Sequence, residues 1–348
     1  MFEEPVTSKE SRGPALLRLL LRIGLLAVIA WGCAALWVDG PSSRPLAGLL
    51  AAMFALTSSW LLFFVRPFLR GALTCLLLFL LLLGWWLHIA PGNDRHWQPD
   101  VAVSPTAEIS GDRLTVRNVR NFEYRSETDY TPRWETRTYD LAKLQGLDLF
   151  LSYWGPRAIA HTILSWQFED SEPLAISIET RKEAGEEYSA VLGFFRQFEL
   201  YYVVADERDL IRLRTNVRGE EVYLYRLRPP PARARALLLS YLAAVNRLAT
   251  TPDWYNAFTH NCTTTIVLHI RDLGLPIVPH WKMFLNGYLD ESLYEQGFIN
   301  RSLAFNHLRE QSAITPVART LDPRAEFSKA IRIGLPDRPP PPDGIGLR

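Results

Sequence analysis

Cysteine is scarce in this sequence, which holds only three, Cys33, Cys75 and Cys262, in 348 residues. No two of them form a CxxC pair, so neither a disulfide-stapled small domain nor a zinc finger is indicated. An excess of charge is also missing, because 38 Lys and Arg residues stand against 37 Asp and Glu residues, a formal net charge of +1. A protein that binds nucleic acid by neutralising phosphates would be clearly basic, so we expect no nucleic-acid partner.

Nearly all the acidic residues lie beyond the first 90 positions, which instead contain three apolar runs, 15–38, 46–65 and 71–90. About 20 apolar residues in a helix cross a hydrocarbon core of about 30 Å, and each run reaches that length. Two more runs follow the first without a clear cleavage site of small residues, which argues against a removed signal peptide. We therefore predict a three-helix transmembrane anchor over residues 1–92.

Basic residues predict how this anchor is oriented. They flank the first run on its N-terminal side and occupy the link between the second and third runs: Lys9, Arg12, Arg18, Arg22, Arg66 and Arg70. Because positive loops stay in the cytoplasm, everything after about residue 91 is expected outside it. In a bacterial host this describes a multi-pass protein of the inner (cytoplasmic) membrane with a periplasmic C-terminal domain. The runs contain no Asp, Glu or Lys, so an anchor is favoured over a transporter.

From residue 97 the composition becomes that of a globular domain. Runs rich in β-branched and aromatic residues predict strands over 113–119, 121–124, 146–153, 161–168, 174–179, 199–205 and 221–225. After three consecutive prolines at 229–231, apolar residues at helical spacing predict helices over 232–249 and 261–273. Strands followed by helices indicate an α+β domain over 97–310. A C-terminal extension over 311–348 ends in a Pro-rich tail of no readable function.

Cys262 is the only cysteine outside the apolar runs, and an unpaired thiol in an oxidising compartment is a candidate reactive group. It lies in the segment HNCTTT (260–265), where a loop becomes a helix. Asn261 can cap that helix, which places Cys262 in its first turn. The N–H groups of such a turn, that of Thr263 among them, favour a thiolate and can hold an oxyanion. A buried cysteine that merely begins a core helix is the alternative, and the residues leave both readings open.

A nucleophilic thiol needs a base within hydrogen-bond reach. His161 begins a strong predicted strand, a position from which its side chain can point into a cleft. His260 is expected to point away from Cys262 on its turn, and His269 lies two helical turns further on. A zinc site made of His260, His269 and His280 matches no familiar metal spacing, so we expect neither a metal nor a cofactor.

Several ordered segments resemble the Lnb N-terminal periplasmic domain family over about residues 100–300. They are NVRNFEYRSETDYTPRW (118–134), TYDLAKLQGLDLFLSYWGPRAIAHTILSWQF (138–168), LAISIETRKEAGEEYS (174–189), FFRQFELYYVVADERDLIRLRTN (194–216) and WYNAFTHNCTTTIV (254–267). The family is named for a bacterial lipoprotein N-acyltransferase and is similar to circularly permuted papain-like thiol enzymes. The resemblance implies a permuted papain-like domain, in which an antiparallel sheet packs with helices and a strand-borne histidine precedes a cysteine at a helix start.

Carried over by position, the family's histidine matches His161, in AHTILSW, and its cysteine matches Cys262, in NCTTT. The resemblance thus implies that Cys262 is the nucleophile and His161 the general base. Glu179, on the next predicted strand, would orient the imidazole if the two strands pair. The alternative for Glu179 is an ion pair with Arg181 or Arg196.

These observations predict a membrane-anchored, cysteine-dependent acyltransferase or hydrolase that forms a thioester at Cys262. Its expected partners are the lipid bilayer and a cell-envelope substrate, either a lipid or a lipoprotein. A thiol amidase acting on peptidoglycan is the alternative within the enzyme class. Outside that class, the chain would be a non-catalytic membrane protein whose outer domain binds an envelope component.

Overall fold

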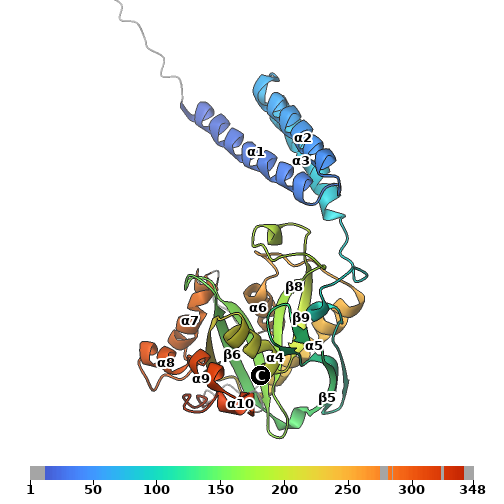
Figure 1. Cartoon of the computed structure of the whole chain (residues 1–348). Helices are drawn as coiled ribbons and strands as arrows, with labels where there is room; N and C mark the ends of the chain where they lie inside the picture. The colour runs from blue at the N-terminus through green and yellow to red at the C-terminus, as the bar shows by residue number, and fades with distance from the viewer. Residues whose placement is uncertain (1–11, 275–280, 284, 323–324, 341–348) are drawn as a thin grey trace, which may run out of the picture. The chain divides into compact units, whose positions relative to one another are not determined.

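The computed structural model describes residues 12–274, 281–283, 285–322 and 325–340. The chain forms two compact units (Figure 1). The first unit comprises the chain up to Ala90 together with Phe195–Gln197, and the second comprises the rest.

Three long helices make up most of the first unit: α1 (Arg12–Val38), α2 (Arg44–Phe64) and α3 (Phe68–Leu87). Each is long and apolar enough to cross a bilayer, with mean hydropathies of 2.2, 1.9 and 2.1 over the spanning stretches. Many of their large apolar side chains face outward, as Leu56 does with 72% of its surface exposed. A soluble bundle would bury such side chains, whereas lipid covers them in a membrane. The three predicted apolar helices are confirmed.

A mixed sheet forms the centre of the second unit, with its strands in the order β1-β2-β9-β8-β7-β6-β10 and β5 also paired to β2. Its strands are β1 (Thr106–Ser110), β2 (Arg113–Arg120), β5 (Trp134–Asp140), β6 (Leu144–Tyr153), β7 (His161–Phe168), β8 (Leu174–Arg181), β9 (Glu199–Ala205) and β10 (Glu221–Arg226). Neighbouring strands run antiparallel except β2 and β9, which pair in parallel at Arg120 and Ala205. A small separate ribbon is made by β3 (Glu123–Tyr124) and β4 (Tyr130–Thr131).

Helices cover both faces of this sheet. They are α4 (Glu207–Arg212), α5 (Pro231–Thr250), α6 (Cys262–Asp272), α7 (Leu289–Glu295), α8 (Phe305–Gln311), α9 (Thr315–Thr320) and α10 (Phe327–Ala330). Shorter helical turns are η1 (Pro99–Val101), η2 (Leu141–Lys143), η3 (Leu192–Phe194), the π-helical η4 (Leu213–Val217), η5 (Trp281–Met283) and η6 (Asn286–Tyr288). A sheet packed with helices in this way confirms the predicted α+β class.

Strand alternation divides the apolar side chains between two cores. Leu164 and Trp166 of β7 join a core with Leu238 of α5 on one face. Ile163 of the same strand joins a second core with Leu210 of α4 on the other face. Since successive side chains of a strand point to opposite faces, the face of Ile163 is also the face of His161, two residues earlier.

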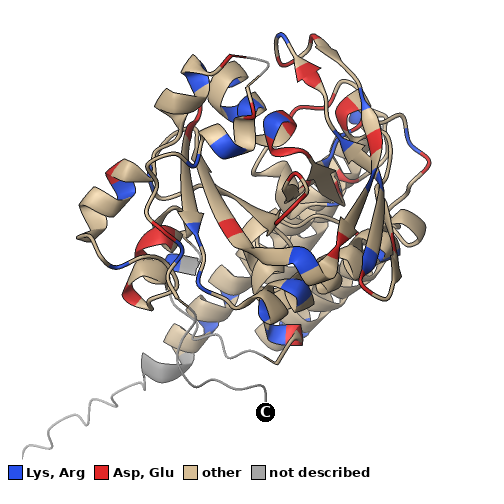
Figure 2. Cartoon of the chain, turned by 90° about the horizontal axis from the view of Figure 1, so that it is seen from below, with Lys and Arg blue, Asp and Glu red and all other residues tan. Residues whose placement is uncertain are grey.

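Buried ion pairs join the C-terminal segment to the second core. Asp148 and Glu207 are fully buried, and the guanidinium of Arg332 lies 2.9 Å from the first and 2.7 Å from the second. Arg338 adds a second cation 2.6 Å from Asp148. Figure 2 shows acidic and basic residues interspersed in this unit, without segregation by sign. The described part of the predicted extension, up to residue 340, therefore supplies counter-charges to the sheet; residues 341–348 of the Pro-rich tail lie outside the described part.

Candidate active site

The start of α6 is held by a complete capping box. Oδ1 of Asn261 accepts hydrogen bonds from the N–H groups of Thr263 and Thr264, each at 2.9 Å. In return, the Thr264 hydroxyl accepts a hydrogen bond from the Asn261 N–H at 2.9 Å. Cys262 is the first residue of the helix. The Thr263 N–H, a predicted oxyanion donor, is therefore occupied by the cap, whereas the Cys262 N–H donates no hydrogen bond within the described part of the chain.

His161 is the first residue of β7, and its ring is held through one nitrogen. Nε2 lies 2.6 Å from Oγ of Ser177 on the neighbouring strand β8. The Ser177 hydroxyl donates to Oε1 of Glu179 at 2.7 Å. The Ser177 hydroxyl has only one proton, which it donates to Glu179, so its oxygen accepts a hydrogen bond from Nε2–H of His161. In a neutral ring the free lone pair is then on Nδ1. The chain of bonds from Glu179 through Ser177 thus selects the tautomer of His161.

Glu179 is fixed by a buried cation as well as by this hydroxyl. Nη2 of Arg214 donates to Oε1 of Glu179 at 2.9 Å, and its Nη1 donates to Glu220 at 3.2 Å. Ser152 donates a further hydrogen bond to Glu220. Burial acts to raise the pKa of Glu179, but its interaction with the nearby His161 ring and the charge of Arg214 hold that pKa well below the usual range. The group is a carboxylate near neutral pH and acts as an acceptor.

The cation that pairs with Glu179 is Arg214, whereas the sequence suggested Arg181 or Arg196. Arg181 instead donates to Oδ1 of Asn93 at 2.9 Å and to the backbone oxygens of Val101 and Ala102, each at 3.0 Å. Its side chain points to the face opposite the hydrophobic core of α5, as alternation from Ile178 requires. Arg214 occupies the place beside Glu179 because the π-helical turn η4 carries it there.

Cys262 is buried, with 8% of its surface exposed. Burial by itself would raise the pKa of Cys262. The charge of His161 and a hydrogen bond with its ring, together with hydrogen bonds from the backbone of Thr162 and the hydroxyl of Thr263, lower that pKa to about 7. The Cys262 thiol is therefore more acidic than an ordinary cysteine thiol.

The ring of His161 shows the reciprocal effect. Burial and the nearby Arg214 act to lower the pKa of His161, whereas its interactions with Cys262 and Glu179 raise it, and the net direction is upward. Thiolate and imidazolium therefore stabilise each other, as in a coupled pair. The structure brings Cys262, His161 and Glu179, which are distant in sequence, into one interacting set.

Three further side chains of this site escaped sequence analysis: Ser177, Arg214 and Asn286. Ser177 alternates with Glu179 on β8, and this spacing is the one local signal that could have found it. Asn286 contacts the start of α6, because its Nδ2 lies 2.8 Å from the Thr263 hydroxyl and 3.8 Å from Sγ of Cys262. Neither Arg214 nor Asn286 stands in a motif that the sequence makes visible.

The other histidines considered from sequence are placed apart from this set. Both ring nitrogens of His269 are engaged, Nε2 at 2.7 Å from the Tyr202 hydroxyl and Nδ1 at 2.8 Å from that of Ser240. Nδ1 of His260 lies 2.9 Å from the hydroxyl of its neighbour Thr259. His280 lies outside the described residues. Among the described residues, no group of three or more His, Cys, Asp or Glu side chains is arranged to hold a metal ion.

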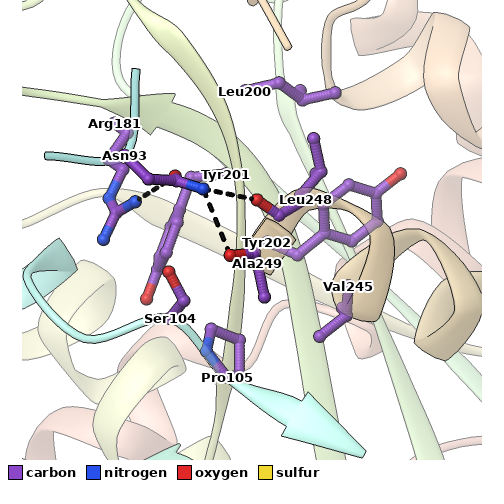
Figure 3. Close-up of a pocket in the computed structure, with 10 residues that line it drawn as sticks. All are labelled: Asn93, Ser104, Pro105, Arg181, Leu200, Tyr201, Tyr202, Val245, Leu248 and Ala249. Carbon is purple, nitrogen blue, oxygen red and sulfur yellow. Dashed lines mark hydrogen bonds between the residues drawn. The ribbon is translucent and has the colours of Figure 1, made fainter. Parts of the chain in front are cut away.

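A small hollow elsewhere in the second unit is structural (Figure 3). Nδ2 of Asn93 donates to the backbone oxygens of Leu248 and Ala249 at 3.0 and 3.2 Å, and Arg181 donates to its Oδ1. The remaining volume is about 10 Å³, room for about one water molecule. This arrangement ties the segment that enters the domain to the end of α5, and it shares no lining residue with the Cys262 site.

Residues 130–284 match the family described as the Lnb N-terminal periplasmic domain. The resemblance inferred from sequence is thus confirmed over that segment, which contains His161, Glu179 and Cys262. Comparisons with curated proteins and with solved structures gave no match. With its three apolar helices and a segment that matches a periplasmic-domain family, the chain is a membrane-anchored protein that carries a periplasmic domain.

The Lnb N-terminal periplasmic domain segment ends two residues before Asn286. It begins within β4 and therefore leaves out β1 and β2, which complete one side of the sheet. The permuted papain-like arrangement stays a prediction. The described geometry places the Cys262 thiol at a helix start and holds the His161 ring through Ser177 and Glu179.

Proposed function

We propose that this protein is a cysteine-dependent acyl-transfer enzyme, anchored as a multi-pass protein in the bacterial inner membrane with its catalytic domain in the periplasm. The observation that carries the proposal is the placement of Cys262 in the first turn of α6, together with a His161 ring held by Ser177 and Glu179. The lowered pKa of Cys262, about 7, agrees with it. A purely structural cysteine buried to this extent would have a raised pKa.

In the first half-reaction the Cys262 thiolate attacks the carbonyl carbon of an acyl ester. A C–S bond forms while the carbonyl π electrons move to oxygen. On collapse, the bond from carbon to the leaving alcohol breaks, and the alcohol oxygen takes a proton from the His161 imidazolium. The products are a thioester at Cys262, a free alcohol and a neutral His161 with its lone pair on Nδ1.

In the second half-reaction an amine or a water molecule attacks the thioester carbon. Nδ1 of His161 takes the proton of the attacking group, the C–S bond breaks, and the thiolate of Cys262 is restored. An amine acceptor gives an amide, and water gives a carboxylic acid. Glu179 holds the imidazolium through Ser177 without itself taking a proton, because its pKa lies well below that of the ring.

The transient oxyanion needs a donor near the sulfur. The Cys262 N–H lies at the positive end of α6 and is not used by the cap, so it is the proposed donor. Asn261 contributes by holding the first turn in helical geometry. Thr263, predicted as a second donor, acts instead through its hydroxyl, which supports the thiolate.

A lipid or a lipoprotein of the cell envelope is the proposed substrate. The domain follows three transmembrane helices within a few residues, so the tether raises the effective concentration of a membrane-bound acyl group. The family name favours transfer from a lipid or lipoprotein. A thiol amidase acting on peptidoglycan would use the same two half-reactions on an amide bond.

The test is direct capture of the thioester. The full chain with Cys33→Ala and Cys75→Ala is incubated in detergent with a synthetic diacylated lipopeptide, and its intact mass is measured. We expect a mass increase of one acyl chain that neutral hydroxylamine removes, and none in a further Cys262→Ala variant. Peptidoglycan fragments in a parallel reaction test the amidase, and acylated peptide against free fatty acid distinguishes transfer from hydrolysis.

A non-catalytic binding domain gives the opposite result. In that case no acyl adduct forms with either substrate, and a membrane-impermeant maleimide labels Cys262 no faster than an ordinary thiol at pH 7. That pair of results would overturn the proposal.

A further inference from the structure

Asn286 makes a two-point clasp on the residue that precedes the proposed base. Its Oδ1 accepts a hydrogen bond from the Ala160 N–H at 2.9 Å, and its Nδ2 donates to the Ala160 carbonyl oxygen at 2.6 Å. This is the pair of bonds that a neighbouring strand would make, supplied here by one side-chain amide. The start of β7, and with it the backbone of His161, is fixed from outside the sheet.

The same amide also reaches the proposed nucleophile's helix. Nδ2 of Asn286 donates to the Thr263 hydroxyl at 2.8 Å and lies 3.8 Å from Sγ of Cys262. The Thr263 hydroxyl in turn lies 3.3 Å from that of Thr162. An amide NH2 has two protons, and these serve Ala160 and Thr263. Asn286 is therefore a bridge between two elements, with no proton left for a substrate oxyanion.

The backbone around Asn286 is itself closely held. A Cβ atom on Gly287 would lie 1.7 Å from the carbonyl oxygen of Arg157, so only glycine permits this approach. The Gly287 N–H donates to the Ala158 oxygen at 3.2 Å, and the Tyr153 hydroxyl donates to the Gly287 oxygen at 2.7 Å. The turn η6 thus docks on the loop before β7, and its position defines that of the Asn286 amide.

We propose that Asn286 is a positioning residue that sets the separation of His161 and Cys262 and thereby the acidity of the thiol. The inference rests on the proposed function. The attraction between thiolate and imidazolium falls with distance and rises with exclusion of water, so a small drift of β7 from α6 weakens it. Burial, which disfavours the thiolate, then dominates.

The experiment measures the rate of Cys262 alkylation by iodoacetamide against pH, in the full chain with Cys33→Ala and Cys75→Ala. We expect the midpoint of the parent near 7 and that of Asn286→Ala about one unit higher, which lowers the rate at pH 7 roughly five-fold. Asn286→Asp keeps the size of the side chain but cannot donate to Thr263, so it is expected to shift in the same direction.

Asn246 provides a matched control. Its amide makes the same pair of hydrogen bonds to the backbone of Ala107, both at 2.8 Å, on the edge strand β1, which three strands separate from β7 in the sheet order. Asn246→Ala removes the same pair of bonds at an exposed position and is expected to leave the alkylation midpoint unchanged. If Asn286→Ala and Asn286→Asp both titrate as the parent does near 7, the positioning role is wrong while the proposed function stands. A parent midpoint near 9 would overturn both.

Discussion

Nε2 of His161 and Oε1 of Glu179 lie 3.6 Å apart on adjacent antiparallel strands, with the Ser177 hydroxyl bonded to both. The carboxylate therefore acts on the ring mainly through a serine rather than by direct contact. A hydroxyl that must donate to the carboxylate can only accept from the ring, so the relay fixes the direction of each hydrogen bond. In a neutral ring this leaves Nδ1 free to act as the proposed base.

The first prediction concerns the acidity of Cys262. Because the pKa of its thiol is about 7, the alkylation rate should rise with pH through a midpoint near 7. In His161→Gln the stabilising charge is gone while burial remains, so the midpoint should move above about 8.5, the value of a free cysteine. Iodoacetamide kinetics between pH 5.5 and 9.5 measure both curves, and coincident curves would show that His161 does not act on the thiol.

The second prediction concerns Glu179→Gln. The amide cannot hold an imidazolium as a carboxylate does, so the thiolate–imidazolium pair loses a charged hydrogen bond of about 1.5–3 kcal/mol. We expect acyl transfer to fall roughly 10–100-fold and the alkylation midpoint of Cys262 to rise. Glu108→Gln, at an exposed position on β1, is the control and should leave both unchanged. A variant of Glu179 with parental kinetics would limit this residue to an ion pair with Arg214.

The third prediction concerns the stability that depends on Arg214. Replacing Arg214 by Met leaves Glu179 and Glu220 without their buried cation, a loss expected to cost about 3–5 kcal/mol of unfolding free energy. Arg117→Met breaks only an exposed pair with Glu108 and should cost about 0–1 kcal/mol. Thermal unfolding of the two variants followed by near-UV circular dichroism compares them. Equal melting temperatures would mean that water enters and solvates the two carboxylates.

The fourth prediction is a loss of stability in mild acid through His269. Burial lowers the pKa of His269 to about 4, whereas the unfolded chain has an ordinary value near 6.5. The unfolded state therefore binds the proton more tightly, and stability is complete above about pH 6.5 and lost as the pH falls toward 4. Between pH 7 and 5 the expected loss is about 2 kcal/mol.

His269→Gln isolates this contribution, because an amide can still bond to the hydroxyls of Tyr202 and Ser240 and does not titrate. The melting temperature of the variant should fall less between pH 7 and 5 than that of the parent. The same fall in both proteins would assign the acid sensitivity to other groups.

Periodicity and length were sufficient to predict the long elements. Helices α5 and α6 begin and end within one residue of the predicted 232–249 and 261–273, because each has a capping or proline signal at its start and a clear apolar stripe. The strand predicted over 121–124 was wrong in extent, since only Glu123 and Tyr124 pair, in a ribbon apart from the main sheet. Strands β1 and β5 were missed because their largely exposed residues lack an apolar run.

The site residues on regular elements could likewise be predicted, whereas those on irregular turns could not. Cys262 and His161 stand at the starts of strongly patterned elements, so their positions could be read from sequence. Arg214 and Asn286 lie in short irregular turns, η4 and η6, whose side chains meet the site only through tertiary packing. No local rule marks such residues, because their partners are tens of residues away in the chain.

The ion pairs between Arg332 and the sheet impose an order on assembly. Asp148 and Glu207 are made early in synthesis, but the arginine that neutralises them comes more than a hundred residues later. A chain is made and folds from its N-terminal end. Until Arg332 arrives, Asp148 and Glu207 therefore lack this counter-charge on one face of the sheet. A chain truncated before Arg332 would keep Cys262, His161 and all the strands. Water would then reach Asp148 and Glu207, and the incompletely folded domain would be open to envelope proteases.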